Sequence, residues 1–177
     1  MRALVAAVLM LGCRPSHAID AKPVNDLVPE KYKYKLAFEQ REVVAEFPRH
    51  ELYTALIPKG WRVDDVGVAK AVDTTANGDS SIWLGASCEH EPCVPEDWNA
   101  AIDREIRLLD VKRDERGDHR RVVVTVPLVA RDVRVITVYW WEDGASEYHW
   151  CEARMTSGLD EAAAAFEKAC GAAISHT

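Results

Sequence analysis

Length, composition and charge restrict the classes to which this protein can belong. The chain has 177 residues, of which 48% are hydrophobic, so it can fold as one domain around a continuous core. A wholly disordered chain is therefore excluded. The formal net charge of −7 argues against binding to nucleic acid, because sequence-independent binding requires a positive surface.

The first 18 residues have the pattern of an export signal. Arg2 precedes the apolar run ALVAAVLML, which extends from Ala3 to Leu11. This run is too short to span a bilayer, which requires about 20 apolar residues in a helix. A positive residue before a short apolar run is typical of a signal peptide. We therefore expect residues 1–18 to direct the protein out of the cytoplasm.

Two cleavage sites compete at the end of this run. Met10-Leu11-Gly12-Cys13 resembles the lipobox of bacterial lipoproteins, with Met10 where that family usually has Leu. The resemblance implies that Cys13 is lipidated and holds the protein on a membrane. Ser16-His17-Ala18 fits an ordinary signal peptidase site instead. We favour the lipoprotein, because the apolar run ends directly at Gly12-Cys13.

The next segment predicts a tether, and a folded domain follows it. Residues 19–30 (IDAKPVNDLVPE) contain two prolines and show no hydrophobic period, which is typical of an unpacked arm. Residues 31–177 are expected to form a single domain.

In the first half of this domain, the hydrophobic pattern indicates strands. From Tyr32 to Phe38, every second side chain is aromatic or large and apolar, the period of a strand with one buried face. Its continuation over residues 42–47 is left open. Pro58-Lys59-Gly60 forms a turn after a second strand, with Trp61 directly behind it. The strands predicted in this half are 32–38, 51–57, 66–72 and 82–88.

The second half predicts two helices and three strands. Pro95 fits the first position of a helix whose apolar face extends from Trp98 to Leu109. A closing helix is predicted over residues 159–173. Between the helices, residues 113–121 are predicted to form a charged hairpin turn built on Gly117-Asp118. The strands predicted in this half are 122–126, 133–141 and 147–155.

The cysteine count agrees with export. Either cleavage route leaves four of the five cysteines to pair, and disulfides form in oxidising compartments. Four cysteines allow three pairings. Cys88 and Cys93 enclose a short loop, whereas Cys151 and Cys170 lie on a predicted strand and on the last helix. We expect the pairs Cys88–Cys93 and Cys151–Cys170.

This order of elements predicts an α+β fold, an antiparallel sheet with helices packed on it. A strand leading into Pro58-Lys59-Gly60-Trp61, a helix in mid-chain, hairpins and a last helix together resemble the PsbP/Mog1-like fold, which also occurs in small bacterial envelope lipoproteins. The resemblance extends over residues 31–174. It implies a non-catalytic accessory or docking module, and it transfers no site residues.

One cluster of residue types suggests a metal site. Cys88, His90 and Cys93 could join His149 and Cys151 around a zinc ion, because thiolates and imidazoles are its preferred ligands. Exported thiols are usually oxidised, however, so we favour a plain disulfide loop. We therefore expect no metal and no cofactor. His90 and His149 are the candidate ligands in the alternative that a metal binds.

An aromatic surface is the second candidate site. Tyr139, Trp140 and Trp141 lie on one predicted strand, and Tyr148 and Trp150 lie on the next. Because successive side chains of a strand point to opposite faces, most of these rings must lie in the core. We expect Trp140 and Trp150 to be the ones that contribute to a binding surface.

No catalytic motif is present in the sequence. It lacks the Gly-x-Ser-x-Gly elbow, the His-Glu-x-x-His helix and a phosphate-binding glycine loop. His119 lies on the predicted hairpin tip, and His50 follows Pro48-Arg49 in a turn, so neither has a visible catalytic partner.

These observations favour an exported, lipid-anchored, non-enzymatic module of the bacterial cell envelope that binds another envelope protein. The alternative is a small-ligand or metal-binding envelope protein. A hydrolase with an unfamiliar site is the third possibility.

Overall fold

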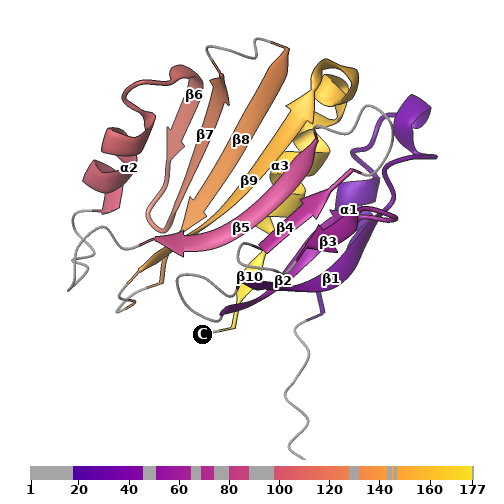
Figure 1. Ribbon diagram of the computed structural model, residues 1–177, viewed down its shortest axis with the longest axis horizontal. Coiled ribbons are helices and arrows are strands. Elements are labelled where there is room, and N and C mark those ends of the chain that lie inside the picture. The colour runs from indigo at the N-terminus through magenta and orange to yellow at the C-terminus, as the bar shows by residue number, and fades with distance from the viewer. Residues whose placement is uncertain are drawn as a thin grey trace, which may run out of the picture.

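The computed structural model describes residues 18–45, 51–64, 69–73, 80–87, 98–127, 132–142, 145 and 147–176. Within these ranges the chain forms two antiparallel sheets with helices packed on them (Figure 1). This arrangement confirms the predicted α+β class. None of the helices in these ranges is long and apolar enough to cross a membrane.

The larger sheet has seven strands in the order β3-β4-β5-β9-β8-β7-β6, so β9 and β8 lie near its centre. Five of the predicted strands are confirmed, and each lies wholly or almost wholly within the described ranges. They are the strands predicted over residues 51–57, 82–88, 122–126, 133–141 and 147–155. The strand predicted over 66–72 is present from Ala69, and residues 65–68 lie outside the described ranges. The bounds are β3 Arg62–Asp64, β4 Ala69–Val72, β5 Ser81–Ser87, β6 Asp110–Arg116, β7 Arg120–Val126, β8 Val133–Trp140 and β9 Tyr148–Thr156.

The smaller sheet joins distant parts of the chain. Its central strand β2 (Glu51–Pro58) pairs with β1 (Phe38–Ala45) on one side and with the short β10 (Ile174–Ser175) on the other. Gly60, in the turn after β2, has a φ of 84°, a backbone conformation that glycine adopts without strain. The turn predicted at residues 58–60 is therefore present.

The two longer helices lie on opposite faces of the larger sheet. Helix α2 (Trp98–Ile106) packs on Val123 of β7, whereas the adjacent Val122 and Val124 belong to the cluster around α3 (Ala163–Gly171). Because neighbouring side chains of a strand alternate between faces, the two helices cover different sides. The start of the predicted last helix forms the 3₁₀-helix η3 (Ser157–Ala162) instead of an α-helix.

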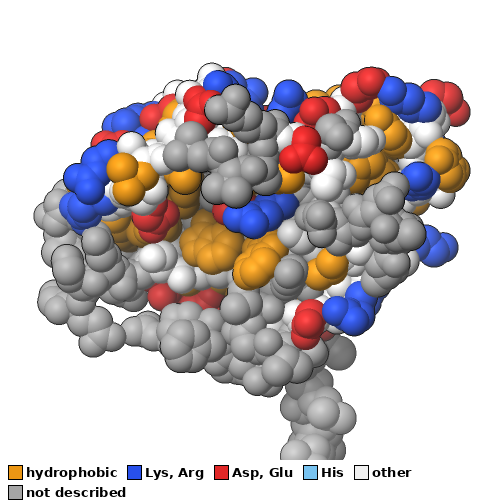
Figure 2. Space-filling view, turned by 45° about the horizontal axis from the view of Figure 1, so that its top comes forward, with side chains coloured by type: hydrophobic (Ala, Val, Ile, Leu, Met, Phe, Trp, Pro, Cys, Tyr) orange, Lys and Arg blue, Asp and Glu red, His pale blue; other side chains and the backbone are white. Residues whose placement is uncertain are grey.

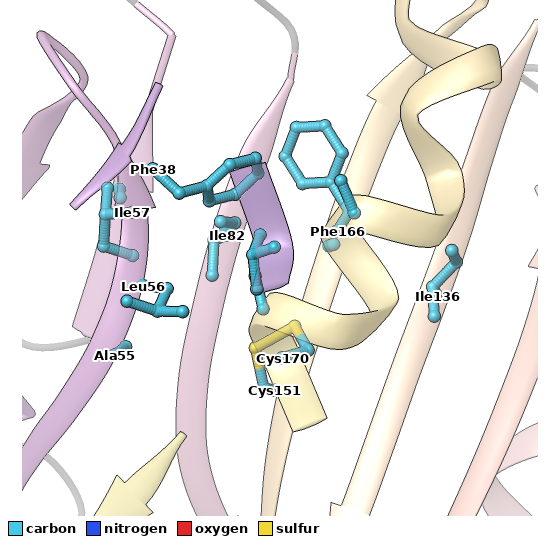
Figure 3. Packing of buried hydrophobic residues seen from close by; sticks show 14 of the residues in the cluster. Phe38, Ala55, Leu56, Ile57, Ile82, Ile136, Cys151, Phe166 and Cys170 are labelled. Atoms are coloured by element: carbon cyan, nitrogen blue, oxygen red, sulfur yellow. A yellow bond between two sulfur atoms is a disulfide. The ribbon is translucent and has the colours of Figure 1, made fainter. Parts of the chain in front are cut away.

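The main core lies between α3 and the two sheets (Figure 3). Phe166 of α3 packs edge-on against Phe38, with ring centroids 5.3 Å apart, and also contacts Trp61. A disulfide joins Cys170 of α3 to Cys151 of β9, and both cysteines are 1% exposed. The predicted Cys151–Cys170 pair is confirmed, and it fastens the last helix to the sheet.

The segment predicted as a tether packs on the domain. It contains helix α1 (Lys22–Asn25), which contacts α3. Val24 and Val28 are 1% and 3% exposed, and the Asn25 side chain accepts from the backbone N–H of Phe38 and donates to its carbonyl. Two valines one helical turn apart are too few to give a detectable period, so the composition suggested an unpacked arm.

The first predicted strand, 32–38, is wrong over most of its length. Residues Glu30–Tyr32 form the 3₁₀-helix η1, and the carbonyl of Tyr32 accepts hydrogen bonds from the N–H groups of Lys35 and Leu36. Tyr34 is 78% exposed. The alternation of aromatic residues therefore reflects a turn, and β1 begins only at Phe38.

Residues 113–121 were expected to be a charged turn, but most of them form the edge strand β6 and the start of β7. Only Gly117 to His119 make the turn between these strands, closed by a hydrogen bond from the Gly117 N–H to the Arg120 carbonyl. Residues 111–116 are all exposed. Charged side chains on an edge strand prevent pairing with other sheets, which explains why its sequence looks like a loop.

Candidate functional site

The seven-stranded sheet has one face that α2 covers only in part. The strand register places Gly85, Trp150 and Tyr139 in one row across this face, and Trp83, Glu152 and Thr137 in the next row. Helix α2 packs over the part formed by β7, β8 and the start of β9. The remaining part, which we call the aromatic face, comprises Trp83, Trp150, Glu152 and Arg154.

The aromatic face is partly open to solvent, because Trp83 and Trp150 are both half-buried. On one side of the molecule, hydrophobic side chains gather at the centre, with basic and acidic side chains at their margin (Figure 2). Exposed aromatic rings with a few polar groups beside them are typical of binding surfaces.

Gly85 determines the position of Trp150. A Cβ atom at residue 85 would lie 2.7 Å from Cζ2 and 2.9 Å from Cε2 of Trp150, closer than real Cβ atoms approach other atoms. The indole therefore lies across β5 in space that only glycine leaves open. The sequence of β5 thus permits a tryptophan from β9 to reach toward Trp83.

Hydrogen bonds fix the polar groups of this face. The Nε1 of Trp83 donates to Ser81 Oγ at 2.8 Å, and the Nε of Arg154 donates to Glu152 Oε1 at 2.9 Å. The Arg154 and Glu152 side chains are 48% and 26% exposed. Their charges compensate each other, so the aromatic face presents polar atoms without a strong net charge.

Arg121 fastens α2 beside the aromatic face. Its guanidinium is fully buried and donates to Asp114 Oδ1 and Oδ2 at 2.8 Å, to Asp103 Oδ1 at 2.6 Å, and to the Asn99 carbonyl at 3.1 Å. Hydrogen bonds from Arg121 lower the pKa of both Asp103 and Asp114 below the ordinary aspartate value. The helix is thereby held on the sheet.

Two tyrosines connect the sheet to α2 at the same border. Tyr148 donates to Glu105 Oε1 at 2.6 Å, and Tyr139 donates to Glu105 Oε2 at 3.4 Å. Burial raises the pKa of Tyr139 far above its ordinary value, so the hydroxyl stays protonated. Glu105 therefore receives both hydroxyls as donors.

A second polar cluster lies on the opposite face of the sheet, around His149. The ring of His149 stacks on Trp140 with centroids 5.6 Å apart, and its Nδ1 is 3.4 Å from the Tyr53 hydroxyl. Tyr53 donates to Glu51, which is also buried. Burial lowers the pKa of His149, which favours the neutral ring. The cluster satisfies polar groups in the interior of the domain.

The two predicted surface tryptophans do not share a surface. Trp150 pairs with Tyr139, whereas Trp140 pairs with His149, and the two tryptophans point to opposite faces of the sheet. Only Trp150 belongs to the aromatic face. Tyr139, Tyr148 and Trp141 are buried next to α2, as expected for core residues.

The proposed zinc ligands are not assembled in the described part of the chain. Cys151 is bonded to Cys170, so its sulfur is not available as a thiolate ligand. His149 lies against Tyr53 and Trp140, and within the described ranges no three His, Cys, Asp or Glu side chains could hold a metal ion. The other zinc candidates, Cys88, His90 and Cys93, lie outside these ranges, as do the lipidation candidate Cys13 and His50.

The sequence did not indicate Trp83, Glu152 or Arg154 as site residues. Trp83 lies on a correctly predicted strand, but its role depends on the pairing of β5 with β9, which sets Trp83 opposite Glu152. The signal that could have found it is Gly85, because a glycine inside a strand often marks a close approach by another group.

The sequence matches no model of a known protein family, and no curated protein matches it at a significant level. Function is therefore inferred from the geometry of this chain.

Proposed function

We propose that the protein is an exported, lipid-anchored, non-enzymatic module of the bacterial cell envelope that binds another envelope protein through the aromatic face. The observation that carries this proposal is the pair of half-buried tryptophans, Trp83 and Trp150, on a sheet face that helix α2 covers only in part. The Cys151–Cys170 disulfide supports the location, because such bonds persist in oxidising compartments.

The residue types of the aromatic face favour a protein partner. Tryptophan and arginine are enriched among the residues that contribute most to protein–protein binding energy. The compensated Arg154–Glu152 pair disfavours a polyanion. The partner segment that fits this face presents an apolar side chain to the indoles, with polar atoms beside it for Arg154 and Glu152.

The PsbP/Mog1-like class is part of the same proposal. An antiparallel sheet with helices on both faces and a last helix fastened to the sheet is compatible with that resemblance. The resemblance implies an accessory or docking role, which agrees with a binding face on the sheet.

The anchor would keep this domain close to the membrane. We propose lipidation at Cys13, and the packed segment begins only a few residues later, because Val24 and Val28 are in the core. The intact mass of the mature protein tests this. We expect a chain that begins at Cys13, carries acyl groups and has oxidised cysteines, whereas retention of Met1 with reduced thiols would refute export.

Site-specific photo-crosslinking in intact cells tests the binding face. A photoreactive amino acid in place of Trp83 should give one discrete protein adduct, because the side chain at this position would contact the partner. Tyr34, which is 78% exposed, provides the control position. Trp150→Ala should abolish the adduct at position 83. The absence of an adduct at 83, or the same adduct from position 34, would refute the proposal.

A small ligand on the same face is the second candidate, because aromatic rings with a few polar groups beside them also line small-molecule sites. In that case the adduct at position 83 would contain no second protein. The hypothesis of a metal-binding protein is tested by metal analysis of protein purified from the envelope, together with a count of free thiols. Four oxidised cysteines and no bound metal would refute that hypothesis.

A further inference from the structure

A concave site lies away from the aromatic face, between helix α3 and the β6–β7 hairpin. It is a cleft of about 550 Å³, and it combines cationic side chains with small residues of the helix. The residues that line it include Arg113, Arg120, Ala164, Glu167, Lys168 and Gly171.

Arg113 holds the two walls of the cleft together. From β6 it forms an ion pair with Glu167 of α3, and its Nε lies 3.5 Å from Glu115. Its charge is thus shared between two carboxylates. Arg113 therefore positions α3 against the hairpin and contributes little net charge to the cleft.

Arg120 and Lys168 differ from Arg113, because their charges are not shared with carboxylates of the described residues. Within the described part of the chain, neither has a carboxylate at ion-pair distance. The Arg120 guanidinium lies directly over Gly171, where a Cβ atom would be 2.7 Å from Cζ. Glycine at this position thus allows the guanidinium to lie against the helix and beside Lys168.

The end of α3 offers a competing explanation, because the C-terminus of a helix attracts cations. Hydrogen bonds to the terminal carbonyls would be the signature of that role. In the described structure the Ala169 and Cys170 carbonyls accept from the N–H groups of Ala172 and Ala173, and Arg120 donates to neither. Among the described residues, no acceptor lies within hydrogen-bond distance of the Arg120 guanidinium, so its N–H donors are available to a ligand.

We propose that this cleft binds a phosphate group, with Arg120 as the bidentate donor and Lys168 as the second cation. A guanidinium matches the geometry of phosphate oxygens, and a lysine adds a mobile point charge. The overall charge of −7 repels anions at a distance, so binding depends on these two side chains and weakens with salt. The phosphate can belong to a soluble ion or to a lipid headgroup.

Titration of the folded protein with inorganic phosphate at low ionic strength, followed by amide NMR, tests the first source. We expect saturable shifts centred on residues 120, 168 and 171. Arg120→Gln and Lys168→Gln should each weaken binding about tenfold, the loss typical of one charged hydrogen bond. Gly171→Ala should weaken it without a change in charge. Lys112→Gln, on β6 outside the cleft, is the matched control and should bind normally.

Flotation with vesicles of phosphatidylcholine, with and without phosphatidylglycerol, tests the second source with protein that lacks the lipid anchor. Binding that requires phosphatidylglycerol and Arg120, without shifts in inorganic phosphate, assigns the cleft to lipid headgroups. Saturable binding of inorganic phosphate alone assigns it to a soluble ligand. The proposal is refuted when neither probe binds, or when Arg120→Gln and Lys112→Gln have equal effects. Unfolding curves of each variant establish that it is folded.

Discussion

Replacement of Arg121 by methionine should destabilise the domain by about 3 kcal/mol. Removal of one partner from a buried ion pair typically costs about 3 to 5 kcal/mol. The lower value applies because the carboxylates left behind, Asp103 and Asp114, are 46% and 24% exposed and can be hydrated. Urea unfolding at neutral pH measures this loss as a change in the free energy of unfolding, at constant m-value.

Arg116 provides the matched control. It contacts the same carboxylates, at 2.7 Å from Asp103 and 3.4 Å from Asp114, but its side chain is 50% exposed. Surface ion pairs contribute about 0 to 1 kcal/mol, so Arg116→Gln should cost less than about 1 kcal/mol. Equal costs for the two variants would refute the role assigned to the buried guanidinium.

The effect of Arg121 should also depend on pH. Arg121 lowers the pKa of Asp103 and Asp114 in the folded state. The resulting stabilisation is complete above the ordinary aspartate pKa of about 3.9 and is lost as the pH falls through the lowered folded values. The difference between the wild type and Arg121→Met should therefore shrink in acid. A difference that stays constant from neutral pH to strong acid would contradict this explanation.

Three further predictions concern other parts of the molecule. The double variant Cys151→Ala/Cys170→Ala should lose about 3 kcal/mol in urea unfolding, because the disulfide closes a loop with a sequence separation of 19, and an unchanged midpoint would contradict this. Gly85→Ala should displace the Trp150 indole, cost about 1 to 3 kcal/mol and change the near-ultraviolet circular dichroism, whereas an unaltered spectrum would mean that the indole does not lie on Gly85. Because burial lowers the pKa of His149, the unfolded chain takes up the proton first, so stability should fall as the pH drops below about 6.5; His149→Gln should remove this dependence, and its persistence in the variant would assign it to another group.

The elements that the sequence predicted well are those with a strong local pattern. Strands β7 and β8 are rich in valine and are buried on both faces, and the last helix carries Cys170 at the spacing needed to reach Cys151. The missed elements lack such a pattern. Every residue of β6 except Val111 is charged, and the two residues of β10 form a strand only because β2 offers them an edge.

The candidate site was predictable only in part for the same reason. Trp150 could be named from its residue type and strand. Arg154 lies on the same strand and face as Trp150, but its residue type alone marked no site. Trp83 could not be named either, because it joins this face through the pairing of β5 with β9, strands that are far apart in the sequence. The same holds for Arg121, whose burial depends on α2 and β6 supplying Asp103 and Asp114.

The position of α3 and β10 in the chain has a consequence for biosynthesis. Phe166 and Cys170 complete the interior, and β10 supplies the second neighbour of β2, so the fold closes only with residues 163–175. A nascent chain in which residues 163–175 are still inside the ribosome therefore exposes its apolar strands, and the domain can complete its core only after these residues emerge.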